Sequence, residues 1–430
     1  MRITVKLSTL YLLLATLAAG TVSAQSDSAA TKSRLTVGGY GEAVYSRHFY
    51  SDNVFRYSFP SRYADAPSYG RVDLPHAVIM LGYDFGHGWT MGTEIEFEHG
   101  GVEAAVEKEM EETGEFEQEV ERGGEVALEQ FWVQKSFSRA FNIRAGHIVV
   151  PVGMTNNNHT PNRFFGVYRP EGENTIMPCT WHETGLALWG RVGHWRYEAQ
   201  VIPGLNAYLF NDQGWIHNGS ASPYEFRPAN RLATALRVDW TGLPGLRLSL
   251  SGYAGNSFNN DITTSIYGDS SRFSDVRGTV LIGAFDFEYR NRVVTVRGNA
   301  DYGFLGDASA ISAHNKNQTT MSGNPYPHTT VAQAAWDASV EAGLNLLAWS
   351  RTSQRLYLFG RYDHYDSFVP SEHQTDVGWC ERQVVSAGLN YCPLPEVTVK
   401  AEAGVRLLAE QFNNEPYCAL GVTWTGFFTR

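Results

Sequence analysis

The sequence predicts an all-β fold: a transmembrane antiparallel up-and-down β-barrel of about 16 strands, with long extracellular loops and short periplasmic turns. Three observations support this prediction. Side chains alternate between apolar and polar, connections alternate between short and long, and aromatic residues stand beside the short connections. From Leu35 to Phe428, about sixteen segments of roughly ten to sixteen residues place an apolar residue at every second position. Such alternation gives each strand one apolar and one polar face.

The alternation is most regular in the second half of the chain. In Trp336 to Leu346 the even positions are apolar, and the odd positions are Asp337, Ser339, Glu341, Gly343 and Asn345. The segments Val397 to Leu407 and Trp89 to Glu98 repeat this pattern. These segments are therefore expected to be strands with one face toward an apolar neighbour.

The connections after even-numbered strands are tight, and the others are long. Tight examples are Gly86-His87-Gly88, Ser138-Arg139, Gly193-His194 and Asn291-Arg292. The long loops are expected at about 51–70, 101–123, 151–181, 205–229, 257–275, 306–333, 367–380 and 410–415. Eight long loops at one rim and short turns at the other are typical of an outer-membrane barrel, here with sixteen strands. A barrel of that size leaves an aqueous channel.

The first 24 residues are expected to be a cleaved signal peptide. Arg2 and Lys6 form a basic start, Leu7 to Ala19 an apolar core, and Val22-Ser23-Ala24 a small-residue cleavage site. A short segment, 25–33, would follow, and 34–430 would form the barrel. The apolar run is too short for a comfortable membrane span, which needs about 20 residues.

A large secreted β-sandwich or solenoid is the alternative fold, because its strands also alternate. Two details favour lipid as the neighbour of the apolar face. The polar faces carry charges of both signs, and aromatic residues stand beside the tight turns, as in an interfacial girdle. These aromatic residues are Phe85, Trp89, Phe137, Phe141, Trp240, Tyr289 and Tyr391. We therefore expect the outer membrane of a Gram-negative bacterium, with its lipid and lipopolysaccharide as surroundings.

The charge of the chain argues against a nucleic-acid partner. Of 34 Lys and Arg, two lie in residues 1–24, which leaves 32 basic against 45 acidic residues and a formal charge of −13. On polar faces the basic residues are Arg191, Arg196, Arg237, Arg247, Arg290, Arg297, Arg382, Lys400 and Arg406. The acidic ones are Glu94, Glu96, Glu198, Asp239, Asp286, Glu288, Asp301, Asp337, Glu341 and Glu402. A mixed wall favours a general diffusion pore with a local path for anions.

The loop 151–181 interrupts the alternation and is too apolar for a free surface loop. Its Phe164, Phe165, Val167, Tyr168, Ile176 and Met177 are expected to anchor it inside the barrel. Folded inward, it would narrow the pore and bring charges to the constriction, where rings of charge set ion selectivity. These charges are Arg163, Arg169, Glu171, Glu173 and Glu183.

The second long loop is a run of nine Glu between Glu103 and Glu121. It is interpreted either as a solvated loop or as a surface for divalent cations or a neighbouring subunit. A bridge between Cys179 and Cys380 is expected, because both lie in long loops, whereas Cys392 and Cys418 lie on strands.

No catalytic or metal-binding motif stands out. His159, His182 and Glu183 lack the H-E-x-x-H spacing, so hydrogen bonding is favoured over metal. No G-x-S-x-G elbow is present, which leaves an enzymatic barrel such as a lipase a minor alternative. No catalytic residue, metal or cofactor is predicted.

The stretch Arg144 to Gly153, followed by Arg163, Arg169, Pro178 and Gly185, resembles the phosphate-selective porin O and P family. Members have a strand with a Gly-x-x-x-x-Pro-x-Gly pattern, here Gly146, Pro151 and Gly153, then a long loop with Arg and Pro. The resemblance implies a sixteen-stranded homotrimeric porin that passes small anions or small hydrophilic solutes. Its phosphate-binding members use a ladder of Arg and a row of Lys, whereas this chain has five Lys after residue 24.

The predicted function is passive diffusion of ions and small hydrophilic solutes, including inorganic anions, through the barrel. The alternative is a non-conducting surface barrel that acts as an adhesin or binds a partner. Residues expected at the constriction or in selectivity are Arg163, Arg169, Glu171, Glu173, Glu183, Arg144, Arg191, Arg196, Arg237, Arg297 and Arg406.

Overall fold

The computed structural model describes residues 34–101, 105–109, 117–121, 124–222, 225–261, 273–316, 329–372 and 374–429. The expected signal peptide 1–24 and the segment 25–33 lie outside these residues, as does much of the acidic loop 101–123. Within the described part of that loop, β5 (Ala105–Glu109) and β6 (Glu117–Glu121) pair as an antiparallel hairpin.

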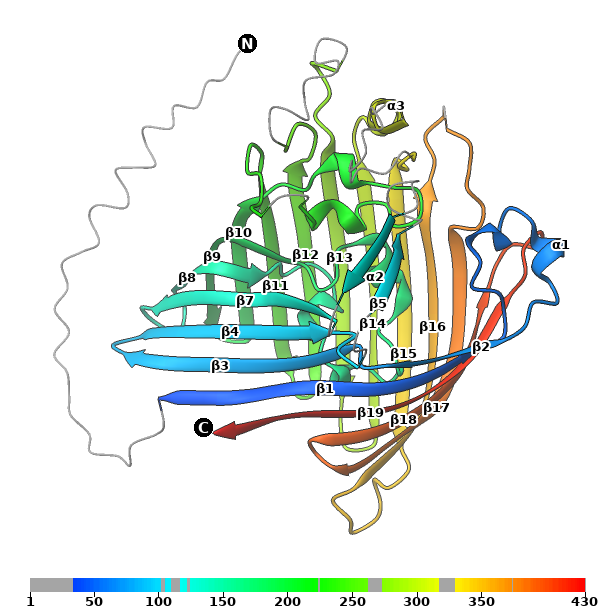
Figure 1. Cartoon of the computed structure of the whole chain (residues 1–430). Helices are drawn as coiled ribbons and strands as arrows, with labels where there is room; N and C mark the ends of the chain where they lie inside the picture. The colour runs from blue at the N-terminus through cyan, green and yellow to red at the C-terminus, as the bar shows by residue number, and fades with distance from the viewer. Residues whose placement is uncertain are drawn as a thin grey trace, which may run out of the picture. The chain divides into compact units, whose positions relative to one another are not determined.

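Sixteen antiparallel strands form a closed barrel (Figure 1). The strands are β1 (Leu35–His48), β3 (His76–Gly86), β4 (Trp89–Glu98), β7 (Glu125–Ser136), β8 (Asn142–Val149), β9 (His182–Val192), β10 (Trp195–Pro203), β11 (Leu232–Leu243), β12 (Leu246–Asn256), β13 (Thr279–Arg290), β14 (Val294–Leu305), β15 (Ala334–Asn345), β16 (Arg355–Val369), β17 (Glu381–Leu394), β18 (Val397–Leu407) and β19 (Glu415–Thr429). Each pairs with the next, and β1 pairs with both β3 and β19. Closure leaves no open sheet edge, and it confirms the predicted fold class.

A seventeenth strand, β2 (Tyr69–Asp73), continues the line of β3. It pairs with the last part of β1, while β3 pairs with the first part. Pro75 stands between the two strands and has no N–H to give to the ladder. β2 and β3 therefore occupy one position in the barrel, which explains why sixteen strands close it.

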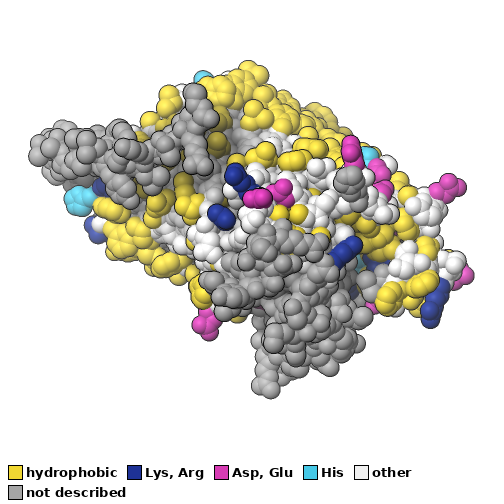
Figure 2. Space-filling model, turned by 90° about the horizontal axis from the view of Figure 1, so that it is seen from above, with side chains coloured by type: hydrophobic (Ala, Val, Ile, Leu, Met, Phe, Trp, Pro, Cys, Tyr) yellow, Lys and Arg dark blue, Asp and Glu magenta, His cyan; other side chains and the backbone are white. Residues whose placement is uncertain are grey.

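The burial of side chains is the reverse of that in a soluble protein. On β15, Val340 is 43% exposed although it is apolar, while Glu341 beside it is 2% exposed. On β16, Leu358 and Tyr362 are exposed, whereas Arg361 and Asp363 are buried. Seen from above, hydrophobic side chains cover much of the visible periphery (Figure 2). An apolar outer belt around a polar interior fits a barrel in lipid and contradicts a soluble sandwich.

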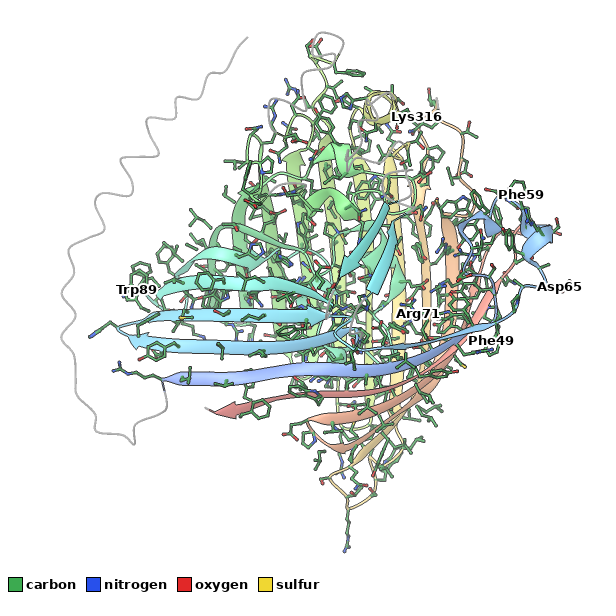
Figure 3. All side chains as sticks on the ribbon, viewed as in Figure 1. Phe49, Phe59, Asp65, Arg71, Trp89 and Lys316 are labelled. Atoms are coloured by element: carbon green, nitrogen blue, oxygen red, sulfur yellow. The ribbon has the colours of Figure 1, made fainter. Side chains whose placement is uncertain are left out.

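The two rims differ in their connections, as the sequence predicts. The turn rim carries short connections such as the one around His87, whose φ of 54° and the positive φ of Gly86 and Gly88 make a tight reversal. The loop rim carries the long connections. Exposed aromatic residues mark both rims: Trp89 at the turn-rim end of β4 and Phe49 just after the loop-rim end of β1 (Figure 3).

The long loops contain all the helices that the structure describes. These are η2 (Val54–Arg56), α1 (Pro60–Tyr63), η3 (Asn156–Asn158), η4 (Pro161–Arg163), α2 (Glu171–Ile176), η5 (Ala207–Leu209), η6 (His217–Ser220) and α3 (Ala308–Lys316). Among the described residues, none of these is long and apolar enough to cross a membrane.

The loops share an apolar core of their own. Trp181 from the loop 151–181, Phe210 and Trp215 from the next loop, and Ile311 from α3 are buried in one cluster. Of the expected anchors of the loop 151–181, Ile176 and Met177 belong to this cluster, whereas Phe165 and Val167 pack on side chains of the barrel wall.

Candidate functional site

The inner loop (151–181) runs from β8 across the inside of the barrel to strands on another part of the wall. The backbone N–H of Phe165 donates to Glu341 Oε2 on β15 at 3.2 Å. That of Val167 donates to Glu402 Oε2 on β18 at 2.7 Å. Charged side chains of the wall thus satisfy the loop's backbone, as buried irregular chain requires.

Lys400 on β18 holds the loop from the same side. Its ammonium donates to the carbonyl oxygens of Pro161 at 2.6 Å, Phe164 at 3.0 Å and Gly166 at 2.8 Å. The residue is 1% exposed. All three ammonium donors are used, so Lys400 positions the loop and is not free for a solute.

The short helix α2 is tied to the wall through Glu171. Its carboxylate pairs with Arg406 on β18 and accepts a hydrogen bond from Tyr365 on β16 at 3.2 Å. Burial alone would raise the pKa of Glu171, but the charge and hydrogen bond of Arg406 outweigh it and lower that pKa. The predicted charges Glu171 and Arg406 are therefore brought together, as an ion pair.

Glu173 and Glu183 are both buried and have partners within the protein. Glu173 is buried within the inner loop and accepts hydrogen bonds from the backbone N–H groups of Met154, Thr155 and Asn156 at 2.9, 2.8 and 3.3 Å. Glu183 is buried at the start of β9 and pairs with Arg227 at 3.2 Å.

Four of the predicted arginines line one cavity of about 390 Å³ toward the turn rim, the arginine cavity. They are Arg163, Arg191, Arg196 and Arg237, and Arg139 and Arg247 join them. The other lining residues are Asn157, Asn158, Gly193, His194, Trp195, Asp239 and Thr241. Because His194 belongs to the turn between β9 and β10, this cavity lies on the turn-rim side of the inner loop.

Three of the arginines that line the arginine cavity are paired with carboxylates. Arg237 donates to Asp239 at 2.7 Å, to Asp286 at 2.8 Å and to the carbonyl oxygen of Gly153 at 2.9 Å. Arg196 and Arg247 also pair with these two carboxylates. By contrast, Arg139 and Arg191 have no ion pair within the described part of the chain. Their guanidinium groups are left to meet a solute, and so is that of Arg163, whose side chain is 34% exposed and lies 3.8 Å from Glu288 Oε2.

The remaining predicted arginines lie elsewhere. Arg297 pairs with Glu341 and, with Arg290, Arg355 and Lys400, lines a smaller cavity of about 110 Å³. Arg144 donates to Gln134 Oε1 at 3.0 Å and lies 4.4 Å from the ring centre of Trp132. The structure therefore divides the predicted set among separate places on the wall.

An acidic cavity of about 410 Å³ lies on the loop-rim side. Its charged and titratable lining comprises Glu96, Glu98, Glu125, Glu129, His147, Cys179, His182, Glu183, His217 and Arg227. Glu98 ends β4 and Glu125 begins β7, which places the cavity near the long loops. The acidic cavity thus lies toward the loop rim, and the arginine cavity lies toward the turn rim.

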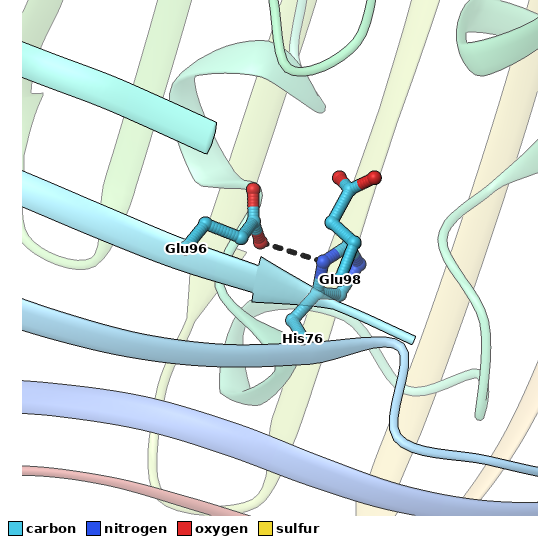
Figure 4. Close-up of side chains that lie close together, drawn as sticks. All are labelled: His76, Glu96 and Glu98. Carbon is cyan, nitrogen blue, oxygen red and sulfur yellow. Dashed lines mark ion pairs between the residues drawn. The ribbon is translucent and has the colours of Figure 1, made fainter. Parts of the chain in front are cut away.

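Beside this cavity, His76 on β3 lies next to Glu96 and Glu98 of β4 (Figure 4). His76 Nδ1 is 2.7 Å from Glu96 Oε1. The alternation on β4 placed Glu94, Glu96 and Glu98 on one polar face, but sequence reasoning missed His76 and Glu129. It also missed the buried ion pair between Arg361 and Asp363 on β16.

The expected bridge between Cys179 and Cys380 is not formed. All four cysteines are free thiols. The sulfur of Cys380 donates to the carbonyl oxygen of Asp212 at 3.3 Å, whereas Cys179 faces Arg169 Nη1 at 4.0 Å. The two sulfur atoms thus have separate partners, and burial raises the pKa of each thiol to about 12.

Solved structures share this architecture. The anion-selective porin from Comamonas acidovorans has a TM-score of 0.52 at 9% identity, over 91% of this chain and 99% of that chain. An OmpF of Salmonella typhi in complex with daunomycin has a TM-score of 0.53 at 11% identity, over 91% and 97%. The fold is that of an outer-membrane porin barrel.

The outer membrane channel DcaP of Acinetobacter baumannii is similar to this porin-like barrel at a TM-score of 0.51 and 11% identity, over 93% of this chain and 100% of that one. In sequence, an uncharacterized protein of Aquifex aeolicus (strain VF5) is 26% identical over 395 residues, which cover 91% of this chain and 80% of that protein. No family model matches the chain. None of these matches singles out the phosphate-selective family that the sequence resembles.

Proposed function

We propose that the chain is a porin through which ions and small hydrophilic solutes diffuse passively across the outer membrane. The observation that carries the proposal is the polar interior of a sixteen-strand barrel, with cavities of about 410 and 390 Å³ on the two sides of the inner loop. A barrel of sixteen strands has room for an aqueous channel. Passive diffusion requires no catalytic group. It requires a hydrated path, and the charged side chains of the wall provide one.

The inner loop is proposed as the constriction, and the arginine cavity as a local path for anions. A solute moving inward would pass first the acidic cavity and then the guanidinium groups of Arg139, Arg163 and Arg191. Guanidinium presents a planar fork of donors that suits phosphate and carboxylate and stays charged at any relevant pH. We expect a preference for small anions, including phosphate. The carboxylates of the acidic cavity should weaken this preference.

A homotrimer is the proposed assembly, on the strength of the sequence resemblance. Its test is the mass of the folded protein in detergent, after the mass of bound detergent is subtracted. Three chains per particle would support the proposal, and one chain would overturn it.

Conductance in planar bilayers tests the proposed function. The folded protein is expected to give discrete current steps, and a salt gradient is expected to give a reversal potential that reports its ion preference. The variant Arg163→Glu is expected to move that potential toward cation preference. Folded, inserted protein that carries no current would overturn the proposal.

A second candidate is a non-conducting surface barrel that binds a partner. It is favoured by the apolar core that the long loops build around Trp181, Trp215 and Phe258, because this core covers part of the loop rim. The same bilayer experiment separates the two candidates, since a plugged barrel inserts without conducting.

A further inference from the structure

Three side chains from separate elements converge beside the acidic cavity: Glu94 of β4, Glu129 of β7 and His159 of the inner loop. One ligand atom of each lies within 4.8 Å of the others. All three are buried: Glu94 and Glu129 are 1% exposed, and His159 is 9% exposed. Buried carboxylates are costly unless a cation or hydrogen bonds compensate them.

Each carboxylate keeps one oxygen without a hydrogen-bond partner. Glu94 Oε1 and Glu129 Oε1 are both buried and accept no hydrogen bond. Their second oxygens are occupied, because Gln130 donates to Glu94 Oε2 and Tyr40 donates to Glu129 Oε2. The hydrogen bonds from Gln130 and Tyr40 thus fix each carboxylate and leave its Oε1 without a hydrogen-bond partner.

The imidazole of His159 is oriented in the same way. Its Nδ1 is 3.0 Å from the carbonyl oxygen of Asn156, which can only accept, so Nδ1 carries the proton. Nε2 stands 3.7 Å from Glu94 Oε1, beyond hydrogen-bond distance, and would bind an ion once it is deprotonated. Metal-binding histidines have this arrangement, with the far nitrogen donating to a backbone carbonyl or carboxylate.

We propose that Glu94, Glu129 and His159 bind a divalent first-row transition-metal ion of the Zn²⁺ class. One imidazole nitrogen and two carboxylate oxygens are ligands that such ions accept, and a fourth position can hold water. Glu94 Oε1 and Glu129 Oε1 would then coordinate a cation that compensates for their burial. The neighbouring acidic cavity, which Glu129 also lines, gives the ion a route.

The charges around the site are consistent with a cation. Glu96 lies nearby and adds a further carboxylate, while the guanidinium of Arg169 interacts with both Glu96 and Glu129 and offsets part of this negative charge. Two carboxylates and a neutral imidazole leave the three ligands with a charge of about −2, which a divalent ion matches. Because His159 is on the loop and the two Glu are on the wall, the ion would fasten the inner loop to β4 and β7.

The test is a titration of chelator-treated, detergent-folded protein with Zn²⁺, followed by calorimetry. One ion per chain is expected at pH 7.5. The variants His159→Gln and Glu129→Gln should each abolish this binding. Tyr40→Phe should weaken it by about 10–100-fold, the usual cost of losing an outer contact to a ligand.

Two other histidines serve as matched controls. His147→Gln and His76→Gln remove imidazoles beside the same cavity without touching the three ligands, and both should bind one Zn²⁺ as the wild type does. A gel-mobility shift on heating shows that each variant is folded. X-ray absorption by the bound Zn²⁺ should show one nitrogen ligand, with the remaining ligands oxygen.

Absence of stoichiometric binding would overturn the proposal, as would binding that both His159→Gln and Glu129→Gln retain. Loss of binding in His76→Gln alone would place the ion at His76, Glu96 and Glu98 instead. The result is independent of the proposed function, because a barrel without conductance can still bind Zn²⁺.

Discussion

Lys400 on β18 and Phe164 of the inner loop are joined twice. The ammonium donates to the Phe164 carbonyl oxygen at 3.0 Å and stands 4.2 Å from the centre of the Phe164 ring. A hydrogen bond and a cation–π contact in a water-poor setting reinforce each other. This contact links the inner loop, which starts after β8, to β18.

The substitution Lys400→Met is therefore expected to loosen the inner loop. It leaves three carbonyl oxygens without their donor, and hydrogen bonds to charged groups contribute about 1.5–3 kcal/mol each. Because Met also removes the cost of burying an ammonium, the net loss is smaller than the sum of the three. We expect a loss of about 2–4 kcal/mol in the free energy of unfolding, together with larger and noisier current steps. Urea unfolding and bilayer recording measure the two effects. Lys316→Met, on an exposed lysine at the end of α3, should change neither, and equal effects in both variants would refute the role of Lys400.

Glu173 predicts a pH dependence of stability. Burial, together with repulsion from Asp337, raises the pKa of Glu173 from 4.5 to about 8, although three backbone N–H groups oppose the shift. The folded state thus holds this proton more tightly than the unfolded state. The contribution of Glu173 to stability is greatest below pH 4.5 and is lost as the pH rises through 8.

The measurement is the free energy of unfolding at pH 5 and pH 9. The wild type should lose more stability over this interval than Glu173→Gln, by at least about 1.4 kcal/mol, the equivalent of one pKa unit. Glu396→Gln, at an exposed turn between β17 and β18, is the control and should behave as the wild type. Parallel pH curves for wild type and Glu173→Gln would contradict the prediction.

How far the sequence predicts this structure depends on whether a feature is local. The strands follow from a period of two, which is a property of neighbouring residues, and the long and short connections follow from Gly, Asn and Ser between them. The inward face of β15 is predictable from this alternation, because Asp337, Glu341 and Asn345 all lie an even number of residues apart.

Glu129 shows where that reasoning fails. On β4, Glu94 pairs with Gln130 and Ile95 with Leu128, so Glu129 is an extra residue in a β-bulge. A bulge changes the direction of a side chain, and it depends on the partner strand rather than on the local pattern. The partners of Lys400 and Glu173 escaped prediction for the same reason, since they come from an irregular loop whose path is set by distant strands.

Reversal of charge at Arg191 tests the arginine cavity. Arg191 lines it and has no ion pair among the described residues, so Arg191→Glu changes the charge by two without breaking an ion pair there. The reversal potential in a salt gradient should move toward cation preference, and the shift should shrink as salt rises, because ions screen the charge. Arg292→Glu, in the turn between β13 and β14 and outside this cavity, should leave the potential close to that of the wild type. A similar shift in both variants would point to surface charge.

The outer belt of the barrel predicts that the cost of a charge depends on depth. Val340 lies near the middle of β15 and faces outward, whereas Val126 lies at the loop-rim end of β7 and also faces outward. In a bilayer, Arg at mid-depth costs about 2–4 kcal/mol, while near the interface it costs about 0–1 kcal/mol. Val340→Arg should therefore destabilise the barrel strongly in lipid vesicles, and Val126→Arg should do so weakly. Equal costs for the two variants would contradict a lipid-facing belt, because a soluble protein has no such gradient of depth.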